Sequence, residues 1–183
     1  SLVVWIVVRA IYIAVIHEAF LYELPFHLCS MAGILCAVHC LTKWKWLGQG
    51  LYTICLPGTV LALLFPNWNF YPVIHFITLE GFLFHMGIVL YVAGKLASHA
   101  KLWQVVLFLT AVVIPIYWFD KKYDVNYMFV NWPSAGSPLV WLADRMGNPG
   151  YLIGYAALVF LCMLLMDAGY LIVAGRRNQK LFF

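Results

Sequence analysis

One apolar stretch of the sequence carries side chains that could do chemistry. Residues 23–40 read ELPFHLCSMAGILCAVHC, and within them His27 and Cys29 lie two positions apart, just after a proline. A cysteine thiolate is a nucleophile that forms covalent intermediates, and a histidine commonly serves as the base that activates it. Ionisable side chains are costly inside a membrane, where they often mark a functional site. The pair therefore indicates nucleophilic chemistry or ligand binding.

Further candidates fall at similar heights on other apolar stretches. The candidate catalytic residues are Cys29, His27, His75 and His85, and the candidate substrate-binding residues are Glu18, Ser30, Asn126 and Tyr127. At about 1.5 Å per residue, His27, Cys29 and His75 fall at one level near the outer surface, whereas His85 falls about 21 Å deep. His85 and Cys29 would meet only if the helix carrying His85 began later or tilted. Simple packing or pairing is the competing interpretation for each residue.

The composition places these residues in a membrane protein. Of the 183 residues, 65% are hydrophobic and only 10% are charged, and the mean hydropathy is +0.91. A typical soluble domain has about 25% charged residues. The sequence therefore predicts an all-α, polytopic transmembrane bundle formed by a single integral membrane domain over residues 1–183.

The apolar stretches define the expected spans. Stretches of about the length that crosses a bilayer, roughly 17–25 residues, occur near residues 2–20, 24–42, 47–66, 71–94, 102–119 and 149–174. They predict about six transmembrane helices. Because the chain enters an apolar stretch almost at once after Ser1, we expect one further span upstream. Pro57 and Pro115 lie inside their spans and are expected to kink them.

The distribution of cations predicts the orientation. The connections on one side carry Lys43, Lys45, Lys95, Lys101, Arg176, Arg177 and Lys180. By the positive-inside rule this side is cytoplasmic, which predicts a plasma-membrane protein with a cytoplasmic C-terminus. Residues 120–148 then form an extracytoplasmic connection, in which we expect Pro138 to Met146 to be a short interfacial helix. His39, near the cytoplasmic end of its span, is expected to snorkel or to cap the helix.

Several functional classes lack support in the sequence. It contains no P-loop, no G-x-G-x-x-G, no H-E-x-x-H and no C-x-x-C motif. Its five cysteines have no spacing typical of a disulfide framework or a zinc site. The positive-inside distribution accounts for the cations, so no nucleic-acid partner is indicated. We predict no metal site and no cofactor.

Three sequence blocks resemble the bacterial YwaF-like integral membrane family. They are LPFHLCS at 24–30, YPVIHFITLEGFLFHMG at 71–87 and NYMFVNWP at 126–133, and their order and spacing fit the family over nearly the whole chain. Related eukaryotic proteins are described as ether-phospholipid acyltransferases that use a cysteine and a histidine within the membrane. The resemblance therefore implies acyl transfer or lipid hydrolysis. In the eukaryotic pattern the cysteine follows the proline directly, where this chain has Phe26, and Cys29 lies about one turn deeper.

Three functions follow from these residues. In the first, Cys29 is activated by His27 or His75 and takes an acyl chain from a membrane lipid, while Asn126 or Tyr127 stabilises the oxyanion. In the second, the same polar cluster is an outward-open pocket for a small-molecule solute, within a transporter or another larger membrane complex. In the third, His27 and His75 bind a haem axially. We prefer the first, with membrane lipids as the partner.

Overall fold

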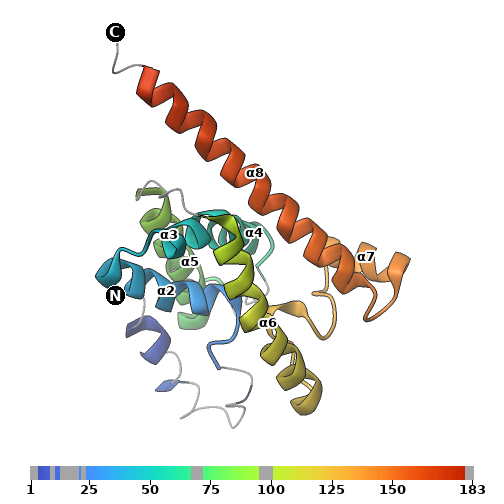
Figure 1. Ribbon diagram of the computed structural model, residues 1–183. Coiled ribbons are helices and arrows are strands. Elements are labelled where there is room, and N and C mark those ends of the chain that lie inside the picture. The colour runs from blue at the N-terminus through green and yellow to red at the C-terminus, as the bar shows by residue number, and fades with distance from the viewer. Residues whose placement is uncertain are drawn as a thin grey trace.

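The computed structural model describes residues 4–8, 11–12, 21, 24–66, 72–94 and 101–173, and the helical backbone of residues 174–179. Within these ranges every regular element is a helix (Figure 1). The elements are α2 (Leu28–Thr42), α3 (Lys45–Gly50), the π-helix η2 (Leu51–Cys55), α4 (Leu56–Leu64), α5 (Phe76–Gly94), α6 (Leu102–Tyr123), the 3₁₀-helix η3 (Tyr127–Phe129), α7 (Pro138–Met146) and α8 (Tyr151–Gln179).

Four helical stretches are long and apolar enough to cross a membrane. They are Lys45–Leu64, which joins α3, η2 and α4, and then Phe76–Gly94, Leu102–Tyr123 and Tyr151–Val173. Helix α2 is apolar but shorter. These helices confirm the predicted transmembrane bundle. Most of the span expected at residues 2–20 lies outside the described residues. Helix α7 occupies the range that was predicted for a short helix, and its location at a membrane surface remains a prediction.

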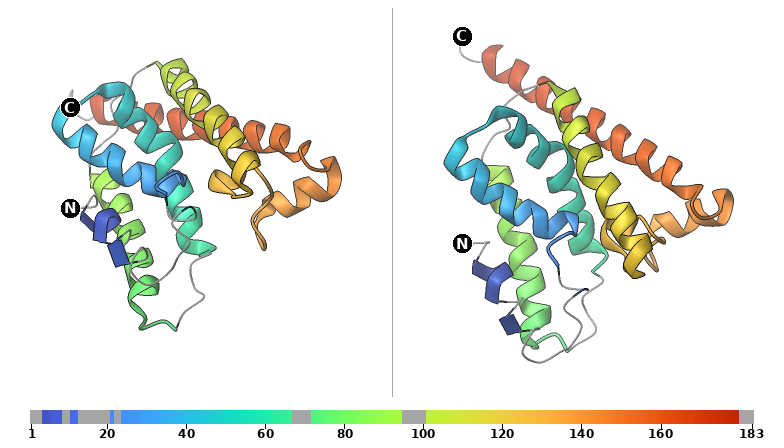
Figure 2. Two further views of the ribbon diagram at one scale, coloured as in Figure 1. Left: turned by 90° about the horizontal axis from the view of Figure 1, so that it is seen from below. Right: turned by 60° about the horizontal axis from the view of Figure 1, so that its bottom comes forward.

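Successive helices alternate in direction and so give the bundle two distinct ends (Figures 1 and 2). At one end, the start of α2 meets the segment that follows α6, where Tyr127 bonds to Leu24. At the other end, His39 near the end of α2 meets Tyr91 near the end of α5. We call these the Tyr127 end and the His39 end.

A π-turn interrupts the helix between Lys45 and Leu64. Leu56 N–H bonds to Leu51 O, five positions back instead of four. Pro57 follows directly, and because proline lacks an N–H and its ring clashes with the carbonyl four residues earlier, it cannot continue a regular α-helix. Single π-turns of this kind often accompany functional sites. The predicted kink at Pro57 therefore takes the form of a local widening of the helix.

The main core lies where α2, η2 and α5 meet. Its buried residues are Ala32, Cys36, Leu51, Cys55, Phe84, Ile88 and Val92. At Gly33, helix α2 lies so close to the Phe84 ring of α5 that an added Cβ would be 2.7 Å from Cζ of that ring. This contact sets the relative heights of α2 and α5.

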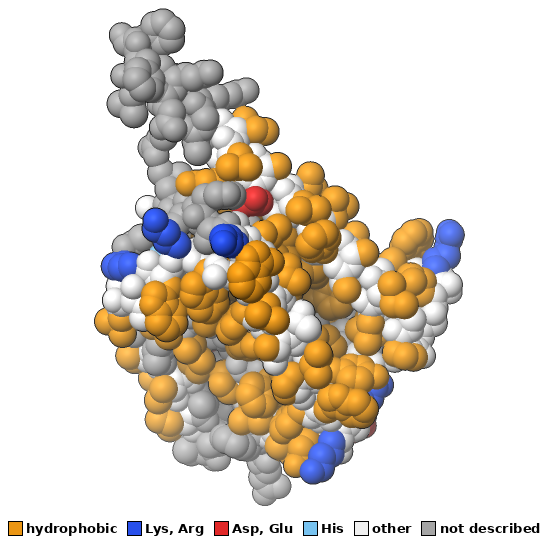
Figure 3. All heavy atoms as spheres, viewed as in Figure 1, with side chains coloured by type: hydrophobic (Ala, Val, Ile, Leu, Met, Phe, Trp, Pro, Cys, Tyr) orange, Lys and Arg blue, Asp and Glu red, His pale blue; other side chains and the backbone are white. Residues whose placement is uncertain are grey.

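Helices α6 and α8 pack much less completely. Large apolar side chains along both are exposed, including Trp103, Leu107 and Trp118 on α6 and Ile153 and Leu165 on α8. Helix α8 also extends beyond the other helices (Figure 1). Apolar side chains cover much of the face seen in Figure 3, and the cations there lie toward its edges. Such a surface suits contact with hydrocarbon, because lipid tails are as apolar as these side chains.

Candidate functional site

Hydrogen bonds to the backbone hold the segment after α6 in one conformation. Asp120, which is fully buried, accepts a bond from Tyr127 N–H through Oδ2 at 2.7 Å. Oδ1 of Asn126 accepts from the N–H groups of Asn131 and Trp132 at 3.1 and 3.2 Å. Asn131 in turn donates to the carbonyl of Val125 at 2.9 Å. Asn126, predicted to bind substrate, therefore has its amide oxygen engaged in the loop itself.

Tyr127 joins this segment to the beginning of α2. Its hydroxyl donates to the carbonyl of Leu21 and accepts from Leu24 N–H at 3.2 Å. Its ring meets the rings of His27 and Phe26 edge-on, with centroids 4.9 and 5.3 Å apart. The segment was predicted to lie at the level of His27, and these contacts agree. The hydroxyl of Tyr127 nevertheless serves to order the backbone before α2.

Two consecutive residues in this segment have an unusual backbone conformation. Met128 and Phe129 have φ angles of 52° and 58°, a region that non-glycine residues seldom occupy and that costs on the order of 1–3 kcal/mol each. Their carbonyl oxygens accept bonds from α8: Tyr151 donates to Phe129 O at 2.7 Å, and Tyr155 donates to Met128 O at 3.2 Å. The first turns of α8 thus help to hold the strained backbone in place.

The Cys29 thiol packs against the apolar core beside a hydroxyl on another helix. That hydroxyl belongs to Thr59, which donates to the carbonyl of Cys55 at 2.6 Å. Because a threonine hydroxyl has only one hydrogen, Thr59 donates it to Cys55 and not to Cys29 in this arrangement. Tyr155 lies close enough to Cys29 to interact with it electrostatically. At rest Cys29 is therefore a thiol, and a base is needed to make it a nucleophile.

His27 is poorly placed to be that base. It is the N-cap residue of α2, and residues two positions apart at the start of a helix do not face each other. Besides Tyr127, its ring lies beside that of Phe129, with the centroids 6.0 Å apart. The described contacts make His27 a link between α2 and the segment after α6.

His75 contacts the first turn of its own helix. It directly precedes α5, and its Nδ1 accepts a bond from Ile77 N–H at 3.3 Å. The first N–H groups of a helix have no partner within the helix, and a side chain at its start commonly supplies one. This bond favours a capping role for His75.

His85 has the geometry expected of a base. It is 92% buried, and its Nδ1 lies 2.6 Å from the carbonyl oxygen of Gly81. A carbonyl can only accept, so Nδ1 donates a proton to it, and this bond fixes the orientation of the ring. A ring held in one orientation is what a general base requires.

His85 also lies nearer the level of Cys29 than the sequence predicted. Helix α5 begins at Phe76, five residues after the apolar stretch begins at residue 71. Phe84, the neighbour of His85, lies against Gly33, and Gly33 is one helical turn from Cys29, or about 6 Å along α2. Because α5 starts late, the difference in depth between His85 and Cys29 is smaller than residue counting predicted, about one helical turn at the contact of Phe84 with Gly33.

The remaining predicted residues fall into different environments. Ser30 is partly buried on α2 beside Cys29, and Glu18 lies outside the described residues. His39 was expected to snorkel or to cap the helix, but its side chain is buried, and its Nδ1 lies 3.0 Å from the Tyr91 hydroxyl. The side chain does not snorkel because α3 folds back over it: a Cβ on Gly48 would lie 2.8 Å from its Nε2.

Three residues beside the site were missed by the sequence analysis. Thr59 and Tyr155 are a threonine and a tyrosine in apolar helices, and neither type is unusual there. Asp120 is the clearest omission, since it is fully buried and its Oδ1 has no hydrogen-bond partner among the described atoms. Its position at the end of an apolar span was the available signal, because carboxylates within spans are rare and often functional.

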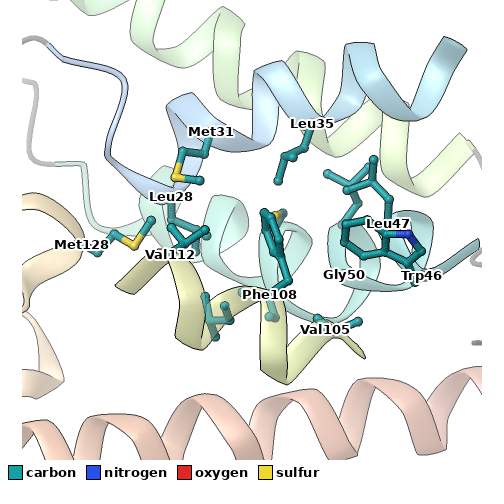
Figure 4. Close-up of a pocket in the computed structure, with 14 residues that line it drawn as sticks. Leu28, Met31, Leu35, Trp46, Leu47, Gly50, Val105, Phe108, Val112 and Met128 are labelled. Carbon is teal, nitrogen blue, oxygen red and sulfur yellow. The ribbon is translucent and has the colours of Figure 1, made fainter. Parts of the chain in front are cut away.

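An apolar groove runs past Cys55 on the side facing α6 (Figure 4). Its lining comes from α2, α3, η2, α6 and η3. The lining residues are Leu28, Met31, Leu35, Trp46, Leu47, Gly50, Leu51, Ile54, Cys55, Val105, Phe108, Leu109, Val112 and Met128. In the described ranges, no three His, Cys, Asp or Glu side chains are grouped so that they could hold a metal ion.

Comparison with known proteins gives one match. The sequence model of the TMEM164 family matches residues 1–167. No curated protein and no solved structure matches the chain.

Proposed function

Since the chain belongs to the TMEM164 family, a family of membrane proteins, we propose that it transfers or hydrolyses acyl groups of membrane phospholipids, with Cys29 as the nucleophile. The observation that carries this proposal is the position of Cys29 against the apolar core, close to Tyr155 and one helical turn from the contact between Gly33 and Phe84. The resemblance to YwaF-like proteins, and through them to ether-phospholipid acyltransferases, supports the same chemistry.

In the first step of the proposed reaction, Nε2 of His85 takes the proton of the Cys29 thiol as Sγ attacks the ester carbonyl of a phospholipid. A C–S bond forms, and the carbonyl oxygen becomes an oxyanion. The Tyr155 hydroxyl, which donates to Met128 O at a long 3.2 Å, can donate to this oxyanion instead. When the intermediate collapses, the ester C–O bond breaks, and the oxygen of the leaving lysolipid takes the proton from His85.

The second step returns the enzyme to its starting state. The hydroxyl of an acceptor lipid, or water, attacks the thioester on Cys29 while His85 takes its proton. The new C–O bond forms, the C–S bond breaks, and the proton passes to Sγ. A lipid hydroxyl gives acyl transfer, and water gives hydrolysis.

We place the Tyr127 end of the bundle at the outer leaflet of the plasma membrane. Lys43, Lys45 and Lys101 lie at the His39 end, and the positive-inside rule makes that end cytoplasmic. The C-terminus of α8 would then also be cytoplasmic. A cysteine introduced at Lys43 should react with a membrane-impermeant maleimide only after the cells are permeabilised.

A mass measurement of the full chain tests the nucleophile. The protein is purified with Cys40→Ser as background, because exposed Cys40 could be acylated nonspecifically, and is incubated in phosphatidylcholine nanodiscs. We expect an acyl adduct that hydroxylamine removes, that is lost in Cys29→Ala and that persists in Cys36→Ala, the control at another cysteine on the same helix. An adduct that survives Cys29→Ala, or no adduct together with unchanged lipid composition, rejects the proposal.

A rate measurement tests the base. His85→Gln should slow adduct formation by roughly 10²-fold, the contribution that general bases typically make. His75→Gln should leave the rate close to that of the unsubstituted chain, because a capping side chain takes no part in the proton transfer. Equal rates for the two variants would remove His85 from the mechanism.

A further inference from the structure

The groove beside Cys55 has the chemistry of a hydrocarbon site. Its lining side chains are aliphatic, aromatic or sulfur-containing, and none is charged. Apolar cavities stay dry, because a buried water needs polar partners that such a lining lacks. In a bundle whose helices cross a membrane, the apolar molecules available in quantity are lipids.

The groove runs along the helices from one end of the bundle toward the other, as the acyl chain of a membrane lipid would. Leu28, Val112 and Met128 lie at its Tyr127 end, and Trp46 and Gly50 lie at its opposite end (Figure 4). Along α2 it extends from Leu28 to Leu35, and along α6 from Val105 to Val112, which at seven residues each is about 10 Å. This is about two-thirds of one leaflet of a bilayer whose hydrocarbon core is about 30 Å thick.

The position of Cys29 defines which end receives the head of the lipid. Cys29 follows Leu28, which lines the Tyr127 end, and it packs against the core cluster that contains Cys55, which also lines the groove. A chain that lies in the groove with its ester at the Tyr127 end would bring the carbonyl carbon to the thiol. The remainder of the chain would then run toward the His39 end.

We infer that this groove binds one acyl chain of a phospholipid, and that Phe108 and Trp46 limit how much of the chain enters it. The direction of the chain rests on the proposed function, whereas its binding does not. Phe108 stands between the two ends of the groove (Figure 4), and its ring centroid lies 5.5 Å from that of Trp46. Together the two rings restrict the passage toward Val105 and Gly50.

The present width of the groove identifies Phe108 as the residue to test. The free volume is only ≈ 30 Å³, far less than an acyl chain occupies. A bound chain must therefore displace the Phe108 ring or lie beside it on the open side. Phe108→Ala removes the ring and opens the groove, so more of the chain can enter and its occupancy of the groove should rise severalfold. Phe108→Trp should narrow the groove further and weaken binding.

Photo-crosslinking measures this binding directly. The full chain is placed in nanodiscs of phosphatidylcholine that carries a diazirine in the middle of one acyl chain, and the crosslinked peptides are mapped by mass spectrometry. We expect adducts on the α2 and α6 segments that line the groove, severalfold more of them in Phe108→Ala and fewer in Phe108→Trp. Leu107→Ala and Leu107→Trp, at an exposed neighbour on α6, are the matched controls and should change nothing.

The same crosslinking in Cys29→Ala separates this inference from the proposed function. Groove adducts that respond to Phe108 in Cys29→Ala support the inference whether or not a thioester forms in the unsubstituted chain. A thioester on Cys29 without groove adducts, or adducts distributed equally over the groove and the exposed face around Leu107, would overturn the inference and leave the nucleophile unaffected. Equal responses to substitution at Phe108 and Leu107 would also overturn it.

Discussion

The two ends of the bundle satisfy their buried polar side chains in different ways. At the Tyr127 end, side chains bond mainly to the backbone: Asp120 accepts from Tyr127 N–H, and Tyr151 donates to Phe129 O. At the His39 end, side chains bond to one another, as in His39 with Tyr91 and Gln49 with Asp167. Bonds to the backbone fix the shape of a segment, whereas bonds between side chains select which helices pair. The bonds at the Tyr127 end therefore hold one loop conformation, and those at the His39 end hold helices together.

The largest effect is expected at Asp120. Asp120→Leu removes the acceptor of Tyr127 N–H inside the bundle and should lower the free energy of unfolding by about 1.5–3 kcal/mol, the range for hydrogen bonds to charged groups. Thermal unfolding in nanodiscs, followed by tryptophan fluorescence, measures the loss. Asp144→Leu, at an exposed carboxylate on α7, is the control. Similar losses in both variants would contradict the importance of Asp120 at this end.

At the His39 end, the largest effect is expected from added volume. Gly48→Ala places a Cβ 2.8 Å from His39 Nε2 and should cost about 1–3 kcal/mol, as overpacking usually does. Thermal unfolding in nanodiscs, followed by tryptophan fluorescence, measures this loss as well. Gly169→Ala, where no atom lies within 4 Å of the added Cβ, should be neutral or stabilising. If Gly48→Ala behaves like Gly169→Ala, the close approach of α3 to His39 is not a constraint.

A pair of matched tyrosine variants compares the two ends directly. Tyr127→Phe loses the bonds to Leu21 and Leu24, and Tyr91→Phe loses one bond to His39. At about 1 kcal/mol for each bond, Tyr127→Phe should be the more destabilising, and hydrogen exchange should rise in the segment before α2. Tyr91→Phe should leave exchange there unchanged. The reverse order of stabilities would refute the difference between the ends.

The smallest effect is expected for the pair of Gln49 and Asp167. Side-chain hydrogen bonds between membrane helices average only about 0.6 kcal/mol, and Oε1 of Gln49 is buried without a partner. Gln49→Leu should therefore change stability by less than about 1 kcal/mol, because losing the bond is offset by removing the unsatisfied oxygen. A loss above 2 kcal/mol in the unfolding measurement would mean that this pair, rather than apolar packing, holds α8 on the bundle.

Much of the fold could be predicted from the sequence, because span length and apolarity depend on local composition. The start of α5 could not, since the apolar stretch begins at residue 71 but the helix begins only at Phe76. That difference decides whether His85 can approach Cys29. Hydropathy does not distinguish helical residues from apolar residues in a connection. A depth obtained by counting residues from the start of an apolar stretch is therefore too large by the length of the apolar connection.

The candidate site was only partly predictable, for a different reason. His27, Cys29, His75 and His85 were identifiable because their side-chain types are rare in hydrocarbon. The proximity of Thr59 to Cys29 depends on how two helices pack, and that of Tyr155 depends on α8, so neither has a local signal in the sequence. For His39 the sequence predicted a structural role from its position near the end of its span, but only the packing of Gly48 against it shows that the side chain is buried.

The π-turn at Leu51–Cys55 changes the direction in which side chains point along one helix, so that the parts before and after it face different neighbours. Each residue of an α-helix turns it by about 100°, so the additional residue of the π-turn rotates everything after it relative to everything before it. Gln49, before the turn, can face α8 while Thr59, after it, faces Cys29. Deleting one residue from the turn would restore a regular helix and allow only one of these two alignments. The rotation introduced by the π-turn, as much as the composition of the helix, therefore determines which residues its side chains contact.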